Sequence, residues 1–346
     1  MNYMYSIASP DIAAKNGSDQ PVELRTGEPY ARLISQHQLF ATRVAGCFGL
    51  NPQAVIPTYG TTGAIEAVRN HVFRIVFKSR PTLLTVNPGY WRAREAFQGF
   101  GFQVITLDTE PFQFDIREDA LIEKSLKTSP DILYLSLPNN PTGATFDPCN
   151  LIAGISPHTA IMLDLTLPSS GLDTVMLTKN LYRQFAGRRG LFLIGSTSKA
   201  QETAEFRIGW VICANEEDAH SLREENRNVL STFAVEHAIP RLGTYPVVLE
   251  RIRECFEMLK ADCEQCRFEL IRPASRVETG YALVRHFWDI SHLRETVLQH
   301  GIRVMWGSEF GLSDHYMRLE TTAPAHMRAF LTAIQKSREK VFPAAR

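Results

Sequence analysis

The residues best suited to chemistry in this sequence surround one lysine, Lys199, in the hexapeptide Gly-Ser-Thr-Ser-Lys-Ala that ends at Ala200. The hexapeptide overlaps an apolar run at residues 191–196, so the lysine stands at the exit of a predicted buried strand. Burying an unpaired ammonium opposes folding or lowers the pKa of the amine. The neutral amine could then attack a carbonyl and form a Schiff base, whereas the alternative is a solvated lysine on a polar turn.

Two arginines and a threonine-rich loop could bind anions. The loop carries Thr61 and Thr62 between two glycines and opens a predicted helix. Its hydroxyls and the free N–H groups of a helix N-terminus suit a phosphate, while a helix capped after a glycine turn is the alternative. Arg207 could clamp a phosphate, and Arg318, within a strand-like run, could hold a carboxylate. For either arginine alone, a surface ion pair is the commoner explanation.

Three further candidates follow or interrupt predicted strands. Tyr90 and Trp91 come just after a strand and could stack on a flat ligand, although aromatic residues in such places more often pack in the core. Asn140 precedes a proline, which holds it extended, so its amide could be aimed at a ligand or could belong to a simple turn. Asp164 interrupts the apolar run 161–165, and a carboxylate in a buried strand requires a cationic or donating partner.

The elements that must position these residues alternate between short apolar runs and amphipathic helices. The predicted strands are residues 54–57, 82–86, 103–107, 132–137, 160–165, 191–196 and 210–214. The predicted helices include residues 31–48, 64–77, 91–100 and 118–127. Strands that are apolar on both faces and separated by helices predict an α/β fold with a mostly parallel seven-stranded sheet covered by helices. Such sheets bind ligands at the carboxyl ends of their strands, where the candidate residues lie.

The pattern changes after residue 214. Long helices are predicted at residues 216–235 and 247–268, strands at 280–287 and 316–320, and a closing helix at 325–341. A proline and a glycine mark a boundary near residue 240. We therefore expect an N-terminal arm at residues 1–30, a large domain at 31–240 and a smaller C-terminal α+β domain at 241–346.

Composition narrows the functional class. Lys plus Arg and Asp plus Glu both total 37, so no net charge favours nucleic acid or an anionic membrane as partner. The first residues lack a signal-peptide pattern, and no apolar run approaches the ~18 residues of a membrane span. Six scattered cysteines fit a reducing compartment, and the Cys263-x-x-Cys266 pair lacks the further ligands of a zinc site. We expect a cytoplasmic protein without a metal centre.

Taken in order along the chain, the loops and strands that carry the candidate residues resemble those of the class I/II aminotransferases, which are pyridoxal-phosphate enzymes of fold type I. The resemblance runs from residue 31 to residue 340 and rests on seven motifs in order along the chain, at residues 60–63, 88–90, 139–143, 164, 196–199, 207–210 and 318. It implies a large cofactor-binding domain and a small domain, pyridoxal 5'-phosphate as cofactor and a small-molecule amino acid as substrate. It also implies a homodimer with active sites near the interface. The expected reaction transfers an amino group from an amino acid to a 2-oxo acid.

The resemblance also implies roles for individual residues. Lys199 would hold the cofactor as a Schiff base and move the α-proton of the substrate as general base and acid. Asp164 would pair with the pyridinium nitrogen, Tyr90 would stack on the cofactor ring, and Asn140 would donate to its phenolic oxygen. Arg318, assisted by Asn140, would take the α-carboxylate of the substrate. The phosphate would be held by three hydroxyls and one guanidinium, those of Thr61, Thr62, Ser196 and Arg207.

One departure from the family pattern leaves the reaction open. Family members usually carry, three residues after the aspartate, a tyrosine that donates to the phenolic oxygen, and this chain has Leu167 there. We expect the loss to raise the pKa of the Schiff base, because the phenolate is less stabilised. The alternative reaction is therefore that of a lyase, cyclase or oxidase of a specialised amino acid, like the capreomycidine-type cyclases or arginine oxidases. Tyr30 is a candidate for the tyrosine that the partner subunit lends to the phosphate. His37, His71 and His286 are candidates for the substrate side.

Overall fold

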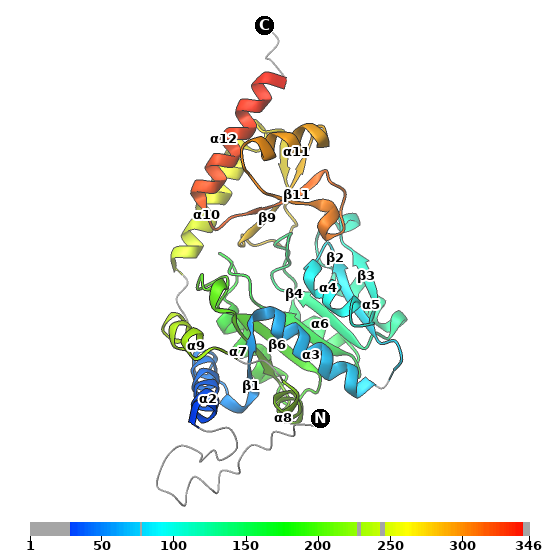
Figure 1. The fold of residues 1–346 in the computed structure, drawn as a ribbon. Helices are drawn as coiled ribbons and strands as arrows, with labels where there is room; N and C mark the ends of the chain where they lie inside the picture. Colours follow the sequence, from blue (N-terminus) through cyan, green and yellow to red (C-terminus); the bar gives the residue numbers. More distant parts are fainter. Residues whose placement is uncertain (1–27, 77, 227–229, 243–245, 342–346) are drawn as a thin grey trace, which may run out of the picture.

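The computed structural model describes residues 28–76, 78–226, 230–242 and 246–341. Most of the predicted N-terminal arm, residues 1–27, therefore lies outside the described residues, as does the side chain of Tyr30. The structure contains two sheets that follow one another along the long axis of the molecule, the larger one below and the smaller one above in Figure 1. The division predicted near residue 240 stays a prediction.

The larger sheet has the mostly parallel, seven-stranded architecture that the sequence predicted. Its strands are β1 (Val55–Tyr59), β2 (Thr82–Asn87), β3 (Gln103–Asp108), β4 (Ile132–Ser136), β5 (Ala160–Asp164), β6 (Leu191–Ser196) and β7 (Ile208–Cys213). Their order is β1-β7-β6-β5-β4-β2-β3, and only β7 runs antiparallel to its neighbours. Every residue of β4, β5, β6 and β7 is buried, because helices cover both faces.

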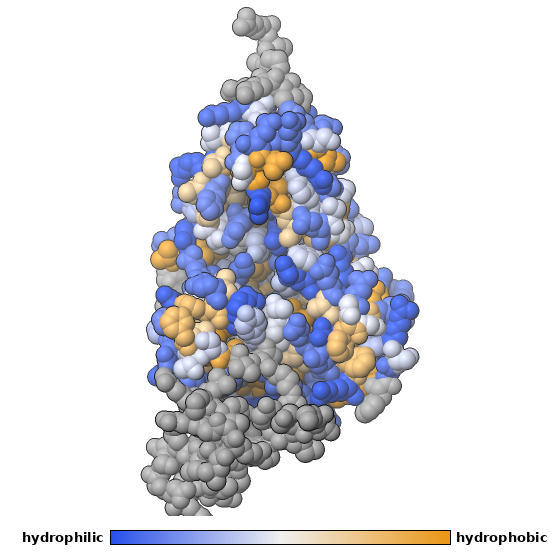
Figure 2. Space-filling view, viewed as in Figure 1, coloured by the Kyte–Doolittle hydropathy of each residue, from blue (hydrophilic) through white to orange (hydrophobic). Residues whose placement is uncertain are grey.

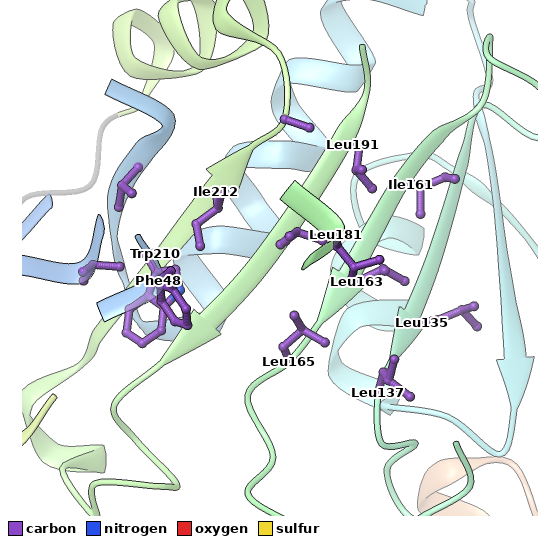
Figure 3. Close-up of a cluster of buried hydrophobic side chains, with 14 of the residues drawn as sticks. Phe48, Leu135, Leu137, Ile161, Leu163, Leu165, Leu181, Leu191, Trp210 and Ile212 are labelled. Carbon is purple, nitrogen blue, oxygen red and sulfur yellow. The ribbon is translucent and has the colours of Figure 1, made fainter. Parts of the chain in front are cut away.

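The helices around this sheet divide between its two faces. They are α2 (Glu28–Phe48), α3 (Gly60–Val76), α4 (Trp91–Gln98), α5 (Glu118–Thr128), α6 (Pro148–Gly154), α7 (Thr174–Gln184), α8 (Glu216–Glu225) and α9 (Thr232–Ala238). Successive strand side chains point to opposite faces, so Leu163 packs with α2 and α7 while Met162 packs with α3. Figure 3 shows the first of these cores, in which Phe48 and Trp210 lie together beside the sheet.

A smaller antiparallel sheet carries the C-terminal part of the chain. Its elements are α10 (Pro246–Asp262), β8 (Phe268–Leu270), β9 (Tyr281–His286), α11 (Ile290–Gln299), β10 (Met305–Trp306), β11 (Tyr316–Glu320) and α12 (Pro324–Val341). The strand order is β10-β11-β9-β8, and the three helices pack against the sheet around a separate hydrophobic core. No helix in the described ranges is long and apolar enough to cross a membrane. Nor do the described residues contain a cluster of side chains that could hold a metal ion.

Two predicted helices were wrong in extent. The helix predicted at 216–235 ends at Glu225, because Asn226 turns extended and its side chain donates to the carbonyl of Pro57 at 2.8 Å. A separate helix, α9, begins only at Thr232. The helix predicted at 247–268 ends at Asp262, since Phe268 is already part of an edge strand. Helices α6, α7 and α11 and the short strands β8 and β10 were not predicted.

A short extended segment before β9 fastens the C-terminal part to the larger sheet. The backbone of Val277 donates to Gly143 at 3.0 Å, and Thr145 donates to Ser275 at 2.9 Å. An isolated antiparallel bridge joins Ala144 to Arg276 within this pairing, and a second one joins Ser169 to Thr279. Gly143 has φ +74°, and a Cβ there would lie 2.6 Å from the carbonyl oxygen of Val277, so the close approach requires glycine. The pairing fixes the start of β9 relative to the loop that contains Asn140.

Candidate active site

Strand alternation brings the predicted site residues to one end and one face of the larger sheet. Ser136, Asp164 and Ser196 are the last residues of β4, β5 and β6, and Ser136 pairs directly with Asp164 in the parallel register. They lie on the side of the sheet covered by α3, whose first turn contains Thr61 and Thr62. Because three parallel strands end side by side, polar groups distant in sequence converge here.

Lys199 lies on the turn that follows β6, at the carboxyl end of this strand. The turn is held by the Thr203 hydroxyl, which donates to the Thr197 carbonyl at 2.9 Å. The Lys199 ammonium lies 5.1 Å from the ring centroid of Tyr281, which comes from β9 of the smaller sheet. Within the described part of the chain, the buried hydroxyl of Ser198 has no hydrogen-bond partner. The lysine thus stands where both sheets meet.

Asp164 is buried and receives hydrogen bonds on both carboxylate oxygens. Oδ2 accepts from the hydroxyl of Tyr134 at 2.9 Å, and Oδ1 accepts from the backbone N–H of Thr166 at 3.0 Å. Burial raises the pKa of Asp164, while the bonds from Thr166 and Tyr134 lower it. Burial also raises the pKa of Tyr134 well above its usual range, so its hydroxyl stays a donor. The sequence analysis missed Tyr134, because an aromatic residue in a buried strand reads as core.

Leu167 points into an apolar environment. It is 7% exposed and lines a cavity of about 20 Å³ together with Phe48 and Trp210. The hydroxyl of the preceding Thr166 lies 2.9 Å from that of Thr61, within hydrogen-bond distance. Leu167 therefore offers no donor, and the hydroxyl of Thr166 is engaged with the first turn of α3.

Arg318 and Asn140 meet across the two sheets. The Arg318 guanidinium donates from Nη1 to Asn140 Oδ1 at 3.2 Å, and its carbon lies 4.0 Å from the ring centroid of Tyr281. The backbone N–H of Asn140 donates to Ser136 Oγ at 3.0 Å, which holds the loop against β4. No described residue accepts from the Asn140 side-chain nitrogen. The asparagine can therefore orient Arg318 and still donate to a ligand.

Tyr90 caps α4 at the same end of the sheet. Burial is the main cause that raises its pKa to about 12, and the negative charge of Asp164 adds to the effect while Arg318 opposes it. Tyr90 is partly buried and packs against the hydrophobic core on the α3 side of the sheet. It is a neutral phenol at neutral pH, and its half-buried ring is available to a flat ligand.

A guanidinium and a helix N-terminus form an anion cradle. Arg207 Nη2 donates to Thr62 Oγ1 at 3.4 Å, and its carbon lies 5.4 Å from the ring centroid of Tyr59. Gly60 has φ +64°, and a Cβ there would lie 3.0 Å from Arg207 Nη2, so the cradle needs glycine. The first N–H groups of α3 have no partners within the helix and face the same place. The donor set suits a phosphate.

The three candidate histidines lie away from these groups. His37 accepts from the backbone of Leu230 at 3.1 Å. His71 lies between α3 and α8, with its ring nitrogens 3.7 Å from Asp218 and 3.5 Å from Glu225. His286 packs within the smaller sheet, against Trp306 and the carbonyl of Asp314. None of them joins the site.

We predict that Tyr134→Phe destabilises the protein by about 1–2 kcal/mol, since a buried bond to a carboxylate is lost and Asp164 keeps fewer donors. Urea unfolding of the cofactor-free protein measures the change. Tyr182→Phe is the matched control, because no described residue bonds to that hydroxyl. Equal stability of Tyr134→Phe and wild type would contradict the importance of this bond.

Comparison with known proteins gives a consistent result. The family model described as aminotransferase class I and II matches residues 10–334. Histidinol-phosphate aminotransferase from Clostridium acetobutylicum has a similar structure, with a TM-score of 0.73 and 17% identity over 90% of each chain. The enzyme of the same name from Sinorhizobium meliloti, solved in complex with pyridoxal-5'-phosphate, gives 0.73 and 15% over 97% of this chain and 96% of its own.

A third solved structure bears a different activity in its name. L-threonine-O-3-phosphate decarboxylase from Porphyromonas gingivalis has a TM-score of 0.68 and 17% identity, over 90% of this chain and 94% of its own. A comparison with curated protein sequences gave no match. At these identities the structural likeness establishes the fold.

Proposed function

We propose a function for this chain from the premise that it belongs to the aminotransferase class I and II family. It is a pyridoxal-phosphate-dependent, aminotransferase-like enzyme of fold type I. Its reaction, in this proposal, transfers the amino group of an amino acid to a 2-oxo acid. The observation that carries the proposal is the Arg318–Asn140 pair, which faces the Lys199 turn across the end of the larger sheet.

The residues present fit pyridoxal phosphate. The cradle of Arg207 and the first turn of α3 suits the phosphate, and the orphaned buried hydroxyl of Ser198 lies next to Lys199. Asp164 offers a fixed carboxylate at the end of β5. When bound, the cofactor supplies an aldehyde that captures amines and a ring that accepts the electrons released at the substrate Cα.

Each predicted site residue has a proposed task. Lys199 would hold the cofactor covalently and would then accept and return the α-proton of the substrate. Asp164, held by Tyr134, would keep a proton on the ring nitrogen. Asn140 would donate from its free side-chain nitrogen, and Tyr90 would stack on the ring. The phosphate would be bound by Thr61, Thr62, Ser196 and Arg207.

Arg318 would bind the α-carboxylate of the substrate. A guanidinium matches a carboxylate in two parallel hydrogen bonds, and the bond to Asn140 uses only Nη1. A carboxylate held here and an amine at the position of Lys199 would place the substrate Cα between them. This orientation would aim the Cα–H bond at the lysine.

A second reaction class deserves testing because Leu167 supplies no donor where the family has a tyrosine hydroxyl. Its side chain faces an apolar cavity. A decarboxylase is among the proteins of similar structure, and one fold hosts several chemistries. The alternative is therefore a lyase, cyclase or oxidase that uses the same Lys199 and Arg318 on a specialised amino acid.

One experiment separates the two reactions. Purified, cofactor-loaded protein is mixed with a panel of amino acids while absorbance and products are followed. Conversion of the cofactor to its amine form with release of a 2-oxo acid, reversed by a second 2-oxo acid, supports transamination. Ammonia, carbon dioxide, peroxide or a cyclised product without that amine form supports the alternative. No spectral change with any amino acid would contradict both.

We also propose that the protein works as a homodimer with its active sites near the interface. Tyr59 and Phe233 are 51% and 60% exposed, and exposed aromatic side chains are enriched at protein–protein interfaces. Phe233 contacts Phe206 at 6.0 Å between ring centroids, and Phe206 adjoins Arg207, so this surface reaches the anion cradle. Hydrophobic residues gather at the position of α9 in Figure 2.

The balanced charge and the reduced cysteines support a cytoplasmic enzyme.

A charge placed on this surface should separate the subunits. We predict that wild type has twice the chain mass of 39.0 kDa in light scattering and that Phe233→Asp shifts towards the single mass. Leu298→Asp, at a 76% exposed position on α11, is the control and should leave the mass unchanged. A wild-type protein of single chain mass at micromolar concentration would contradict the dimer.

A further inference from the structure

The ring of Tyr281 lies close to both cations of the candidate site. The Lys199 ammonium is 5.1 Å from its ring centroid, and the Arg318 guanidinium carbon is 4.0 Å away. One of these cations comes from the larger sheet and the other from the smaller one. Both distances fall within the range in which a cation is attracted to an aromatic ring.

The backbone around Tyr281 is held in place. Tyr281 opens β9 and pairs with Glu320, two residues from Arg318 on the adjacent strand. The hydroxyl of Thr279, which is fully buried, donates to the Tyr281 carbonyl at 2.9 Å. Thr279 also forms an isolated antiparallel bridge with Ser169, in the loop that follows β5. The ring is therefore fixed relative to both halves of the site.

The position of Tyr281 has a chemical consequence that rests on the proposed function. If the substrate amine replaces Lys199 and its carboxylate meets Arg318, the substrate Cα lies beside the ring. The negative face of the ring holds the guanidinium by attraction, so less side-chain entropy is lost when a carboxylate binds.

We propose that Tyr281 is a positioning residue, which presents the Arg318 guanidinium to the substrate carboxylate through the face of its ring. The task requires an aromatic face and not the hydroxyl. Tyr281→Phe keeps the face, whereas Tyr281→Leu keeps apolar bulk without it. The two variants therefore separate this task from simple packing.

The experiment titrates the cofactor-loaded protein with 3-phenylpropionate and isovalerate, which carry a carboxylate and no amine, using calorimetry. We expect Tyr281→Leu to weaken carboxylate binding about tenfold and Tyr281→Phe to remain within about twofold of wild type. With an amino acid that the panel shows to react, Tyr281→Leu should raise KM about tenfold and change kcat by less than about threefold. A purely structural role would not produce this split together with rescue by phenylalanine.

Arg318→Gln distinguishes failure of this inference from failure of the proposed function. If Arg318→Gln weakens carboxylate binding while Tyr281→Leu binds like wild type, the role of Tyr281 is overturned and that of Arg318 stands. If Arg318→Gln binds as tightly as wild type, the carboxylate site itself is overturned. Thermal unfolding confirms that each variant is folded. If Tyr281→Leu does not fold, Tyr281→Met replaces it, with the same expected loss.

Discussion

Replacement of Lys199 by alanine is expected to abolish covalent attachment of pyridoxal phosphate and to lower turnover by at least about 10³-fold. The variant loses both the amine that would hold the cofactor and the group that would move the α-proton, and proton transfer alone is worth 10²–10⁴-fold. Borohydride reduction followed by mass spectrometry measures the attachment. Steady-state kinetics with a reactive amino acid measures the turnover.

An exposed lysine provides the control for Lys199→Ala. Lys127 is 71% exposed and pairs with Glu123, so Lys127→Ala should keep both the attachment and the turnover. Attachment at full yield in Lys199→Ala would mean that another amine holds the cofactor. The central assignment of the site would then be wrong.

Asp164→Asn should have the second-largest effect, a fall in turnover of about 10²–10³-fold, because a neutral amide cannot stabilise a proton on the ring nitrogen. The substitution fits the site sterically. The amide oxygen can still accept from the Thr166 N–H, and the amide nitrogen can donate to the oxygen of Tyr134, whose hydroxyl rotates. Loss of activity would therefore report on charge and not on misfolding. A variant with wild-type turnover would contradict the role of Asp164.

The same substitution should stabilise the cofactor-free protein at neutral pH. Burial raises the pKa of Asp164 in the folded state, so the folded protein binds this proton more tightly than the unfolded chain. Stability is therefore lost as pH rises from the unfolded pKa through the folded one, and the penalty is complete above it. Asp164→Asn removes the penalty and should melt at a higher temperature than wild type at pH 7, with the advantage shrinking in acid.

The exposed Asp119 is the control for this pH dependence. Its hydrogen bond with Arg117 lowers the pKa of Asp119, which is the opposite direction from Asp164. Asp119→Asn should therefore not raise the melting temperature at pH 7. A melting temperature of Asp164→Asn below that of wild type at pH 7, and unchanged by acid, would contradict a buried, ionised carboxylate.

The strands of the larger sheet could be predicted because burial on both faces leaves a continuous apolar run. The run at 191–196 matches β6 from end to end. The polar residues that end such runs, Asp164 and Ser196, lie as expected at the carboxyl ends of neighbouring strands. The helix predicted at 216–235 failed because of one long-range contact. Helical spacing of apolar residues continues past Asn226, whereas the side chain of that residue bonds to the distant Pro57 and turns the chain.

Two further tyrosines of the site, Tyr134 and Tyr281, could not be found from the sequence. Tyr134 reads as one apolar member of a buried strand, and its contact with Asp164 depends on the register between β4 and β5. Tyr281 opens a strand of the smaller sheet, and its approach to Lys199 depends on how the two sheets are fastened together. Pairing register and sheet docking are long-range properties that local periodicity does not encode.

The backbone pairing at residues 275–279 limits how this chain can be recombined with its relatives. In this chain Val277 packs so tightly against Gly143 and Gly171 that a Cβ on either glycine would lie within 2.8 Å of the valine. A chimaera joined near residue 240 would place the relative's own residue at position 277 against these two glycines. A crossover placed after Gly280 keeps that contact native and exchanges Tyr281 and Arg318 together. The proposed carboxylate-binding pair could then be exchanged as one unit while the part of the chain that contains Lys199 and Asp164 stays unchanged.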